Sequence, residues 1–315
     1  KMKIIILEPI GITKEMLKSL EDEFSANNHE LVVYSNRPES ESETINRASD
    51  ADILIVSNLP LSEKVIDHCP SLKLISVAFA GFDHIPVNHC KKKNIVVSNA
   101  AGYSTHAVAE LTIGMTISLM RKIVWCDDQT RNGLTREGFL GSELFGKTFG
   151  IIGYGNIGAE VARLAHAFGC KVVVYSRSKK TDGNINFVDL TTLLKESDII
   201  SLHVPLTLET HHLIGEKELR LIKSSSILIN TARGQVVDYT TLFKALKAKK
   251  IAGAALDVYE KEPPLEKDYP LFELPNVLLM PHIGYATSEA IDYRGEIVFD
   301  NIRSWMQGKP INVVN

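Results

Sequence analysis

The sequence predicts an α/β protein built from two doubly wound, parallel-sheet domains. Strand-like apolar runs alternate with helical patterns from one end of the chain to the other, which is typical of parallel sheets. The 315 residues are enough for two separate hydrophobic cores. A glycine-rich turn, Gly153-Tyr154-Gly155-Asn156-Ile157-Gly158, stands near the middle of the chain. These observations indicate two α/β units, the second of which begins shortly before that turn.

The first hundred residues predict one open α/β unit of flavodoxin-like size. Helical stretches such as Lys14 to Phe24 separate short apolar runs. The expected strands are Lys3 to Leu7, Leu31 to Tyr34, Asp52 to Val56, Leu74 to Ala78 and Ile95 to Val97. The regular alternation favours a single sheet with helices on its faces.

A long, mostly apolar helix is expected from Ser104 to Met120, with Ser104 or Thr105 as its N-cap. The second α/β series follows it. Its expected strands are Phe149 to Ile152, Lys171 to Tyr175, Asp198 to His203, Ser226 to Asn230, Ala252 to Asp257 and Val277 to Met280. A helix from Ala286 to Met306 closes the series. No low-complexity linker or repeat separates the halves, so we expect two domains joined by crossing helices, with a cleft between them.

The glycine-rich turn has the context of a phosphate-binding turn. It follows the predicted strand Phe149 to Ile152 and precedes the amphipathic helix Ala159 to Ala165. Gly153 permits the tight turn, Gly155 lets the backbone approach a pyrophosphate, and Gly158 lets helix and strand pack closely. The first helical N–H groups, at Asn156 and Ile157, offer the positive end of the helix dipole. An ordinary βα turn is the alternative, and we favour dinucleotide binding in a Rossmann domain.

Composition and charge exclude several classes of function. A net charge of −3, with both signs scattered, gives no reason to expect nucleic acid or a membrane surface as partner. Apolar runs such as Ile4 to Leu7 are far too short to span a bilayer. No secretory signal is visible, so we expect a cytoplasmic protein. The four widely spaced cysteines, Cys69, Cys90, Cys126 and Cys170, suggest neither disulfides nor a metal site.

Three charged residues follow predicted strands of the second half. Arg233 follows the strand that ends at Asn230, Glu262 follows the strand Ala252 to Asp257, and His282 follows Val277 to Met280. Since ligands bind outside the carboxyl ends of strands in open α/β sheets, these side chains can converge on one molecule.

The residue types suit one reaction. An arginine binds a carboxylate with its planar fork, and a histidine beside a glutamate is a switchable proton donor. Beside a nicotinamide, such a histidine protonates the oxygen of a carbonyl group that accepts a hydride. Taken singly, Arg233 could be a surface ion-pair partner, Glu262 a solvated loop charge and His282 a core histidine at a strand end.

Together with these residues, five segments resemble the D-2-hydroxyacid dehydrogenase family, in the family's order and over nearly the whole chain. They are Gly146 to Gly153, His203 to Thr207, Asn230 to Gly234, Ala255 to Tyr259 with Glu262-Pro263, and Pro281 to Gly284. The resemblance implies that a dinucleotide-binding domain, residues 100–283, is inserted into a substrate domain, residues 1–99 with 284–315.

The resemblance also implies roles for individual residues. Arg233, Glu262 and His282 correspond to the substrate-orienting arginine, the carboxylate partner and the acid/base, with Arg233 and His282 touching substrate. Ala80 and Gly81 resemble the loop that holds the substrate carboxylate through backbone N–H groups. The other positions that resemble the family's cofactor contacts are Thr105, Val204, Pro205, Thr210, Thr231, Ala232, Asp257, His282 and Gly284.

The segment after strand Lys171 to Tyr175 bears on the choice of cofactor. Sites for NAD usually place an acid about twenty residues past the glycine turn, to bind the ribose 2′-hydroxyl. This chain has Ser176-Arg177-Ser178-Lys179-Lys180 there instead. Hydroxyls and cations would bind a 2′-phosphate, so we favour NADP(H). NAD(H) remains possible, because a basic solvated loop without preference is the alternative.

The resemblance implies reduction of a small 2-oxo acid, and the basic cofactor segment resembles the glyoxylate and hydroxypyruvate reductase branch. One alternative is an NAD-dependent dehydrogenase of the D-lactate or D-3-phosphoglycerate type. Another is a non-catalytic protein of the same fold that senses the dinucleotide. A homodimer is expected, formed through the region from Glu110 to Gly146.

Overall fold

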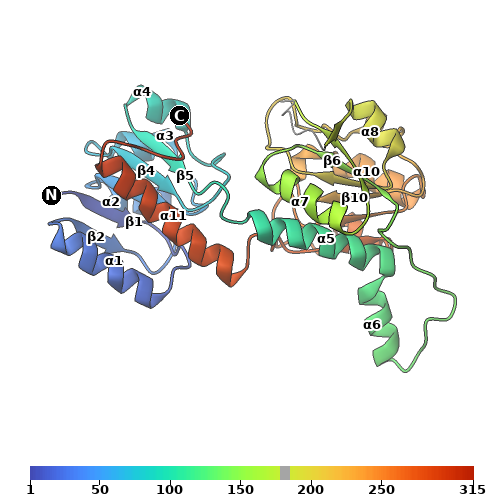
Figure 1. The fold of residues 1–315 in the computed structure, drawn as a ribbon. Coiled ribbons are helices and arrows are strands. Elements are labelled where there is room, and N and C mark those ends of the chain that lie inside the picture. The colour runs from blue at the N-terminus through green and yellow to red at the C-terminus, as the bar shows by residue number, and fades with distance from the viewer. Residues whose placement is uncertain (178–184) are drawn as a thin grey trace. The chain divides into compact units, whose positions relative to one another are not determined.

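The structure, a computed structural model, describes residues 1–177 and 185–315. The chain divides into two compact units (Figure 1). Unit 1 comprises Lys1–Ser104 and Ala286–Asn315, and unit 2 comprises Thr105–Tyr285. The expected α/β class with two parallel sheets is confirmed.

Unit 1 contains a five-stranded parallel sheet in the order β2-β1-β3-β4-β5, the flavodoxin-like order. Its strands are β1 (Lys3–Ile6), β2 (Glu30–Val33), β3 (Ile53–Val56), β4 (Leu74–Val77) and β5 (Val96–Asn99). Its helices are α1 (Lys14–Ala26), α2 (Glu41–Ala48), α3 (Glu63–Asp67), α4 (Val87–Lys92) and α11 (Ser288–Met306). The central strands β3 and β4 are buried along their whole length, which explains their unbroken apolar sequence.

The last helix belongs to unit 1, although almost 190 residues separate it from β5. Ser76 in β4 donates a hydrogen bond to the Val298 carbonyl (3.0 Å), and the Asn301 amide donates to the Asn99 carbonyl (3.0 Å). These buried bonds fasten α11 to β4 and to the edge strand β5. The helix begins after Thr287, whose hydroxyl accepts a hydrogen bond from the Ala290 N–H as an N-cap.

Unit 2 contains a seven-stranded parallel sheet in the order β12-β11-β10-β9-β6-β7-β8. Its strands are β6 (Thr148–Ile152), β7 (Lys171–Tyr175), β8 (Asn186–Phe187), β9 (Ile199–Leu202), β10 (Ile227–Asn230), β11 (Gly253–Leu256) and β12 (Val277–Leu279). Its helices are α5 (Thr105–Arg121), α6 (Ile123–Arg131), α7 (Asn156–Ala167), α8 (Leu190–Glu196), α9 (Glu216–Leu219) and α10 (Tyr239–Lys247). Two 3₁₀ turns, η1 (Gly234–Val236) and η2 (Pro270–Glu273), complete the unit.

Helices cover both faces of this sheet. Ile151 and Ile199 face a core that α5 and α7 complete, whereas the next residues, Ile152 and Ile200, face a core built with α8, α9 and α10. This alternation of two buried faces explains why the strands are continuous apolar runs. The chain winds from β6 to one side through β7 and β8, then returns to β9 on the other side. The loops after β6 and β9 therefore flank the switch point where doubly wound sheets bind ligands.

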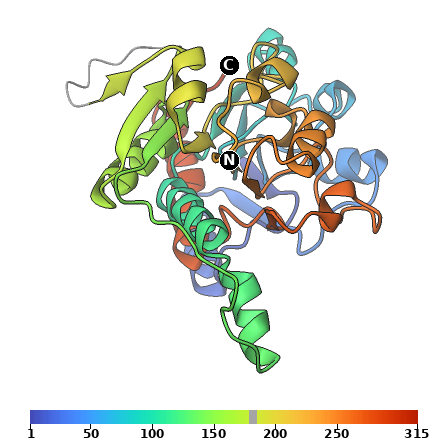
Figure 2. The same cartoon turned by 90° about the vertical axis from the view of Figure 1, so that its right-hand side faces the viewer.

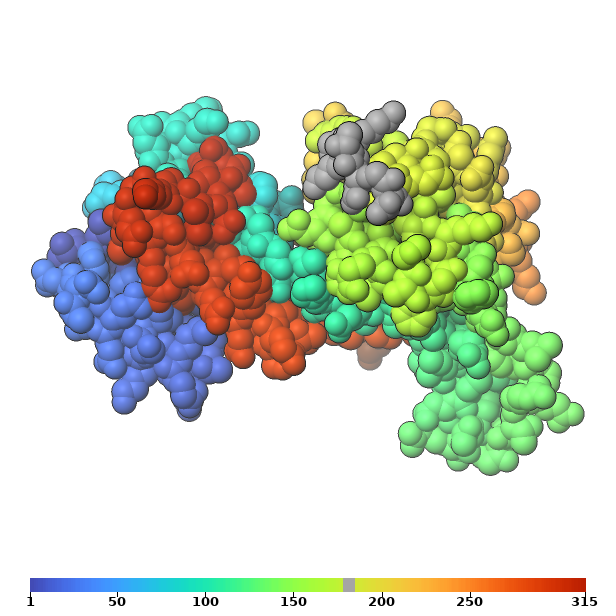
Figure 3. Space-filling model, viewed as in Figure 1, coloured from blue at the N-terminus to red at the C-terminus, as the bar shows by residue number. Residues whose placement is uncertain are grey.

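Helix α6 and the segment that follows it stand away from the body of unit 2 (Figures 2 and 3). No residue of α6 is buried. Several large apolar side chains of this arm are exposed, among them Val124 (62%), Leu134 (57%), Leu140 (88%) and Phe145 (77%). No described helix combines the length and apolarity needed to cross a membrane. The four cysteines, all within the described residues, are free thiols.

Candidate active site

The first and third glycines of the turn after β6 are required by the packing of the protein itself. Gly153 has φ +101°, and a Cβ there would lie 2.4 Å from the His203 carbonyl oxygen. A Cβ at Gly158 would lie 2.0 Å from the Gly153 carbonyl oxygen. Any side chain at either position would collide with backbone, so the close approach of β6, α7 and the loop after β9 depends on glycine.

The packing of the protein does not require glycine at the second position of the turn. Gly155 caps the 12-residue helix α7 in an extended conformation, and a Cβ there would meet nothing within 4 Å. Open space therefore lies beside the helix N-terminus, where Asn156 and Ile157 begin the first turn and the dipole favours an anion. The turn fits the pyrophosphate of a dinucleotide, since a side chain at Gly155 would occupy the space into which the phosphates must come.

A cavity of about 350 Å³ extends from this turn along the ends of β7 and β9. Seven residues predicted from the sequence to contact the cofactor line it, namely Gly153, Gly155, Ser176, Arg177, Val204, Pro205 and Thr210. Six further lining residues were not predicted, namely Tyr154, Tyr175, His203, Thr207, Glu209 and Leu213. Ser178, also predicted, lies outside the described residues. The cavity has the position expected for the adenosine part of the cofactor.

Glu209 is the most informative of the residues that the sequence reasoning missed. Its Oε2 lies 2.7 Å from Nη1 of Arg177, and the two side chains are 71% and 85% exposed. An acid that binds the ribose is expected at the end of β7, whereas this carboxylate comes from the loop after β9. The neighbouring Thr210 hydroxyl donates to the Pro205 carbonyl (2.6 Å) and accepts from the Thr207 N–H (2.8 Å), which fixes that loop.

Of the remaining predicted cofactor residues, Asn156, Ile157 and Gly158 belong to the glycine turn and the first turn of α7, and the others lie elsewhere and do not line this cavity. Thr105 begins α5 and is partly exposed. Thr231 is buried with its hydroxyl 3.1 Å from that of Thr112 in α5, and the Ala232 N–H donates to the Asn230 side-chain oxygen (3.0 Å). Thr231 and Ala232 thus form the turn that leads from β10 to Arg233.

Buried contacts join the ends of β10, β11 and β12. A Cβ at Gly234 would lie 1.9 Å from the Tyr259 carbonyl group, so the loop after β10 rests directly on the loop after β11. The hydroxyl of the buried Tyr259 donates to the Met280 carbonyl (2.8 Å) at the end of β12. The hydroxyl of Tyr239 donates to the Val258 carbonyl (2.5 Å). These bonds hold together the three loops that carry Arg233, Glu262 and His282.

The structure places His282 and Glu262 side by side. The imidazole Nδ1 lies 2.9 Å from Oε2 of Glu262, so Nδ1–H donates to the carboxylate and Nε2 is the nitrogen that can exchange a proton with a ligand. The His282 backbone has φ +59°, an uncommon conformation for a non-glycine residue that is concentrated at functional sites. The Tyr285 ring meets the imidazole edge-on, with 5.7 Å between the ring centroids.

Asp257 holds the backbone of the His282 loop. It is almost fully buried (1% exposed), and its two carboxylate oxygens accept hydrogen bonds from the N–H groups of Ile283 (2.8 Å) and Gly284 (2.7 Å). A Cβ at Gly284 would lie 2.9 Å from Oδ2 of Asp257, so glycine permits this contact. Burial raises the pKa of Asp257, and the two N–H donors oppose that rise. Both oxygens therefore position the loop that bears His282.

Arg233 stands at the end of the turn after β10. Its Nη1 donates to the Ala232 carbonyl (2.8 Å), and the buried Asn230 amide donates to the Arg233 carbonyl (3.0 Å). The backbone on both sides of the guanidinium is thus fixed by Asn230. Because β10, β11 and β12 are neighbours in the sheet, this cation lies at the same edge as the imidazole and the carboxylate.

The loop after β4 in unit 1 carries Ala80 and Gly81. The Asn99 amide donates to the Ala80 carbonyl (2.7 Å), and the Ala100 N–H donates to the Phe79 carbonyl (3.0 Å). Within the described residues, the N–H groups of Ala80 and Gly81 donate to no protein acceptor. The loop therefore offers two backbone N–H donors, and the hydrogen bonds to its carbonyl groups fix their position.

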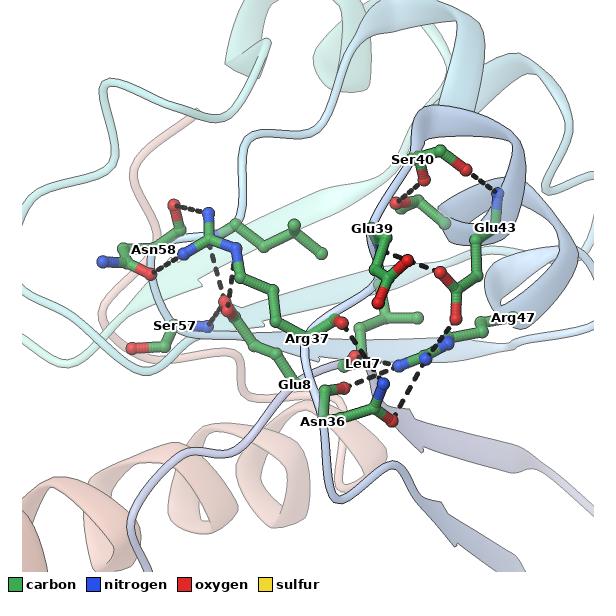
Figure 4. A network of polar contacts seen from close by, with 12 residues as sticks. Leu7, Glu8, Asn36, Arg37, Glu39, Ser40, Glu43, Arg47, Ser57 and Asn58 are labelled. Atoms are coloured by element: carbon green, nitrogen blue, oxygen red, sulfur yellow. Dashed lines mark hydrogen bonds and ion pairs between the residues drawn. The ribbon is translucent and has the colours of Figure 1, made fainter.

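The neighbouring loop after β3 is fixed by a buried carboxylate (Figure 4). Oε1 of Glu8 accepts hydrogen bonds from the N–H groups of Ser57 (2.9 Å) and Leu59 (2.7 Å). Nη1 of Arg37 donates to the Asn58 side-chain oxygen (2.9 Å), and Nε of the same guanidinium lies 3.8 Å from Oε2 of Glu8. Two loops at the carboxyl end of this sheet are therefore rigidly held.

The geometry of unit 2 supports acid–base chemistry on a ligand with a carbonyl group. A glutamate-paired imidazole, a guanidinium at the same sheet edge and a glycine turn with open space at a helix N-terminus lie within one fold unit. A hydroxy acid could lose its hydroxyl proton to the neutral imidazole, and the carbonyl oxygen of an oxo acid could gain a proton from the imidazolium.

Comparison with known proteins identifies the family. The sequence profile of the NAD binding domain of D-isomer specific 2-hydroxyacid dehydrogenases matches residues 113–284. The glyoxylate reductase of Thermococcus litoralis is 44% identical over 282 residues, which cover 85% of this chain and 84% of that protein. Among solved structures, an acyclic imino acid reductase in complex with NADPH and D-Arg is 36% identical, with a TM-score of 0.92 and 100% of both chains covered.

The D-lactate dehydrogenase of Aquifex aeolicus, solved with NAD and lactic acid, is 32% identical, with a TM-score of 0.84 and 98% of this chain and 96% of that chain covered. These similarities extend over both units, and the resemblance inferred from the sequence motifs is confirmed. The chain belongs to the D-isomer-specific 2-hydroxyacid dehydrogenase family and is an NAD(P)-dependent 2-hydroxyacid dehydrogenase.

Proposed function

We propose that this enzyme uses NADPH to reduce small 2-oxo acids, with glyoxylate and hydroxypyruvate as its preferred substrates. The observation that carries the proposal is the 2.9 Å pair of His282 and Glu262, at the same sheet edge as Arg233 and in the same unit as the glycine turn. Relatives named glyoxylate reductase support this substrate class, including that of Thermofilum pendens, which is 41% identical over 300 residues.

Each charged residue has a distinct task in the reaction. The nicotinamide, when bound, supplies the hydride to the carbonyl carbon. Protonated His282 holds its proton at Nε2 and gives it to the carbonyl oxygen, while the Glu262 carboxylate stabilises the imidazolium before transfer. Arg233 binds the substrate through its guanidinium fork and orients the carbonyl group. In the oxidation direction neutral His282 accepts the proton from the hydroxyl group.

The substrate carboxylate is assigned to Ala80 and Gly81. Their backbone N–H groups are the kind of donor that binds an anion without a full positive charge. In this proposal residues 1–99 with 284–315 form the substrate domain, and residues 100–283 form the dinucleotide-binding domain. The nicotinamide end of the cofactor site is shaped by Asp257, Thr231, Ala232 and Gly284. Thr105 lies near the cofactor.

The preference for NADPH rests on Arg177 and Ser176 at the end of β7. Both line the cavity beside the glycine turn, where a guanidinium and a hydroxyl would bind a 2′-phosphate. The imino acid reductase was solved with NADPH and the D-lactate dehydrogenase with NAD, so both cofactors occur among similar structures. NADH use at lower efficiency is compatible with this site.

A panel of 2-oxo acids assayed with NADPH and with NADH tests the proposal. Glyoxylate and hydroxypyruvate with NADPH should give the highest kcat/KM, and the Arg177→Ala variant should raise the KM for NADPH far more than that for NADH. Higher efficiency with pyruvate and NADH would favour a D-lactate dehydrogenase. Equal effects of Arg177→Ala on both cofactors would remove the argument for NADPH.

Two other activities belong in the same panel. The D-3-phosphoglycerate dehydrogenase of Methanocaldococcus jannaschii is 40% identical over 87% of this chain, but the match covers 53% of that protein. Oxidation of D-3-phosphoglycerate tests this relationship. Adding ammonia to the 2-oxo acid assays tests imine reduction, in view of the similar imino acid reductase. Binding of nucleotide without turnover of any substrate would indicate a dinucleotide-sensing protein instead.

A homodimer formed through the region from Glu110 to Gly146 is part of the proposal. The exposed apolar side chains of the α6 arm, such as Val124 and Leu140, are the type of surface that a partner subunit covers. Light scattering of the wild type and of Leu140→Asp tests it, since the substitution should yield monomers. The reducing cytoplasm is the proposed location, because it suits four free thiols.

A further inference from the structure

The cavity beside the glycine turn contains an exposed ion pair whose two members favour different cofactors. Arg177 comes from the end of β7 and Glu209 from the loop after β9, and their side chains meet at 2.7 Å. A 2′-phosphate attracts the guanidinium and repels the carboxylate, whereas a ribose 2′-hydroxyl donates a hydrogen bond to the carboxylate. The pair thus joins one group suited to NADPH with another suited to NADH.

We propose that Glu209 is a specificity-determining residue that weakens binding of 2′-phosphorylated dinucleotides by competing for Arg177. This inference rests on the proposed cofactor site and adds a residue to it. In the absence of a 2′-phosphate, Arg177 stays paired with Glu209. When a 2′-phosphate enters, Arg177 must exchange the carboxylate for the phosphate, and Glu209 is left beside a like charge.

The exposure of the pair limits the size of the effect and makes the variants suitable for a test. Exposed ion pairs contribute up to about 1 kcal/mol, which corresponds to about a fivefold change in affinity. Both side chains are more than two-thirds exposed, so replacing either one leaves the core unchanged. Because exposed charges are screened by ions, the effect should shrink as the salt concentration rises.

The test measures the binding of adenosine fragments by titration calorimetry, independently of turnover. Adenosine 2′,5′-bisphosphate represents the NADPH end, and 5′-AMP represents the NADH end. Glu209→Gln should tighten the bisphosphate about three- to fivefold at low salt and should not tighten 5′-AMP. The gain should be clearly smaller when the same substitution is made in an Arg177→Ala background, because only the direct repulsion between Glu209 and the 2′-phosphate is then left to relieve.

Glu216→Gln is the matched control. Glu216 forms a similar exposed pair with Arg220 in the same unit but does not line the cavity, so its removal should leave both fragment affinities unchanged. Equal tightening of both fragments by Glu209→Gln, or equal gains with and without Arg177, would overturn the inference while leaving the cofactor site intact. Failure of the wild type to bind either fragment would overturn the cofactor site as well, and this inference with it.

Discussion

Alanine at Gly153 should destabilise the fold, whereas alanine at Gly155 should leave its stability almost unchanged, although the two residues are only two positions apart. At Gly153 the φ of +101° disfavours any L side chain, at a cost of roughly 1–2 kcal/mol. The added Cβ would also lie 2.4 Å from the His203 carbonyl oxygen, which is backbone that cannot turn aside. Overpacking of this kind adds about 1–3 kcal/mol.

The expected loss of stability for Gly153→Ala is therefore about 2–5 kcal/mol. For a folding unit of this size, each kcal/mol lowers the melting temperature by about 2–4 °C, so a drop of roughly 4–20 °C is expected. Gly155→Ala adds a Cβ with no neighbour within 4 Å and a permitted φ of −87°, so its melting temperature should change little. Its Cβ would, however, stand where the pyrophosphate approaches the backbone, which should weaken NADPH binding at least about tenfold.

Two measurements separate these effects. Thermal unfolding without ligand reports the strain, and fluorescence titration with NADPH reports the dinucleotide site. If Gly155→Ala binds NADPH as tightly as the wild type, the open space at the α7 N-terminus is not the phosphate site. A Gly153→Ala variant as stable as the wild type would show that the turn after β6 can relax away from the His203 carbonyl group.

Three further predictions concern the acid–base residues and their supports. Glu262→Gln should lower kcat for reduction, because the carboxylate that accepts the Nδ1–H hydrogen bond and orients the His282 imidazole is replaced by an amide; an unchanged kcat would count against the pair. Asp257→Asn should destabilise the fold by about 1–3 kcal/mol and lower kcat, since one N–H of the 283–284 backbone then faces an amide NH₂ group. Denaturant unfolding measures the loss of stability, and single-turnover rates measure the loss of activity. Burial lowers the pKa of His203 to about 3, so the unfolded chain binds this proton more readily and stability is lost as pH falls below about 6.5. Between about pH 6.5 and about pH 5.5, the free energy of unfolding should fall by about 1 kcal/mol less in His203→Gln than in the wild type, as measured by urea unfolding at each pH.

The positions of the strands could be predicted because buried parallel strands leave an unmistakable pattern. Runs such as Ile227–Asn230 and Lys171–Tyr175 are apolar on both faces and end at polar or glycine-rich loops. The two-residue strand β8 (Asn186–Phe187) escaped prediction because it is too short to show a period and is held by pairing with β7. Strand ends carry ligands in this fold, so Arg233 and His282 were also accessible to sequence reasoning.

The supports of the site were not accessible in the same way. Tyr259 and Asn230 bind backbone groups of other strand ends, and such contacts depend on which strands are neighbours and in what register. Glu209 could not be recognised from the sequence for a related reason. The loop after β9 meets the end of β7 only because the sheet places both strands beside β6, one on each side. Sequence distance gives no sign of that meeting, although the polar Thr207–Thr210 loop marks the place.

The register of the sheet explains why the site suits a small substrate. Asn230 is paired with Leu256, and Leu256 with Leu279, so β10, β11 and β12 end level with one another. Arg233, Tyr259 and His282 each come three residues after one of these paired positions. Adjacent strands lie about 4.8 Å apart, so the ends of β10 and β12 lie about 10 Å apart across β11. In the proposed site, a molecule of a few carbon atoms fits between an arginine and a histidine that follow these two strand ends. A bulky 2-oxo acid would have to extend beyond this edge of the sheet, so the pairing of β10, β11 and β12 itself limits the part of the substrate that arginine and histidine can hold together.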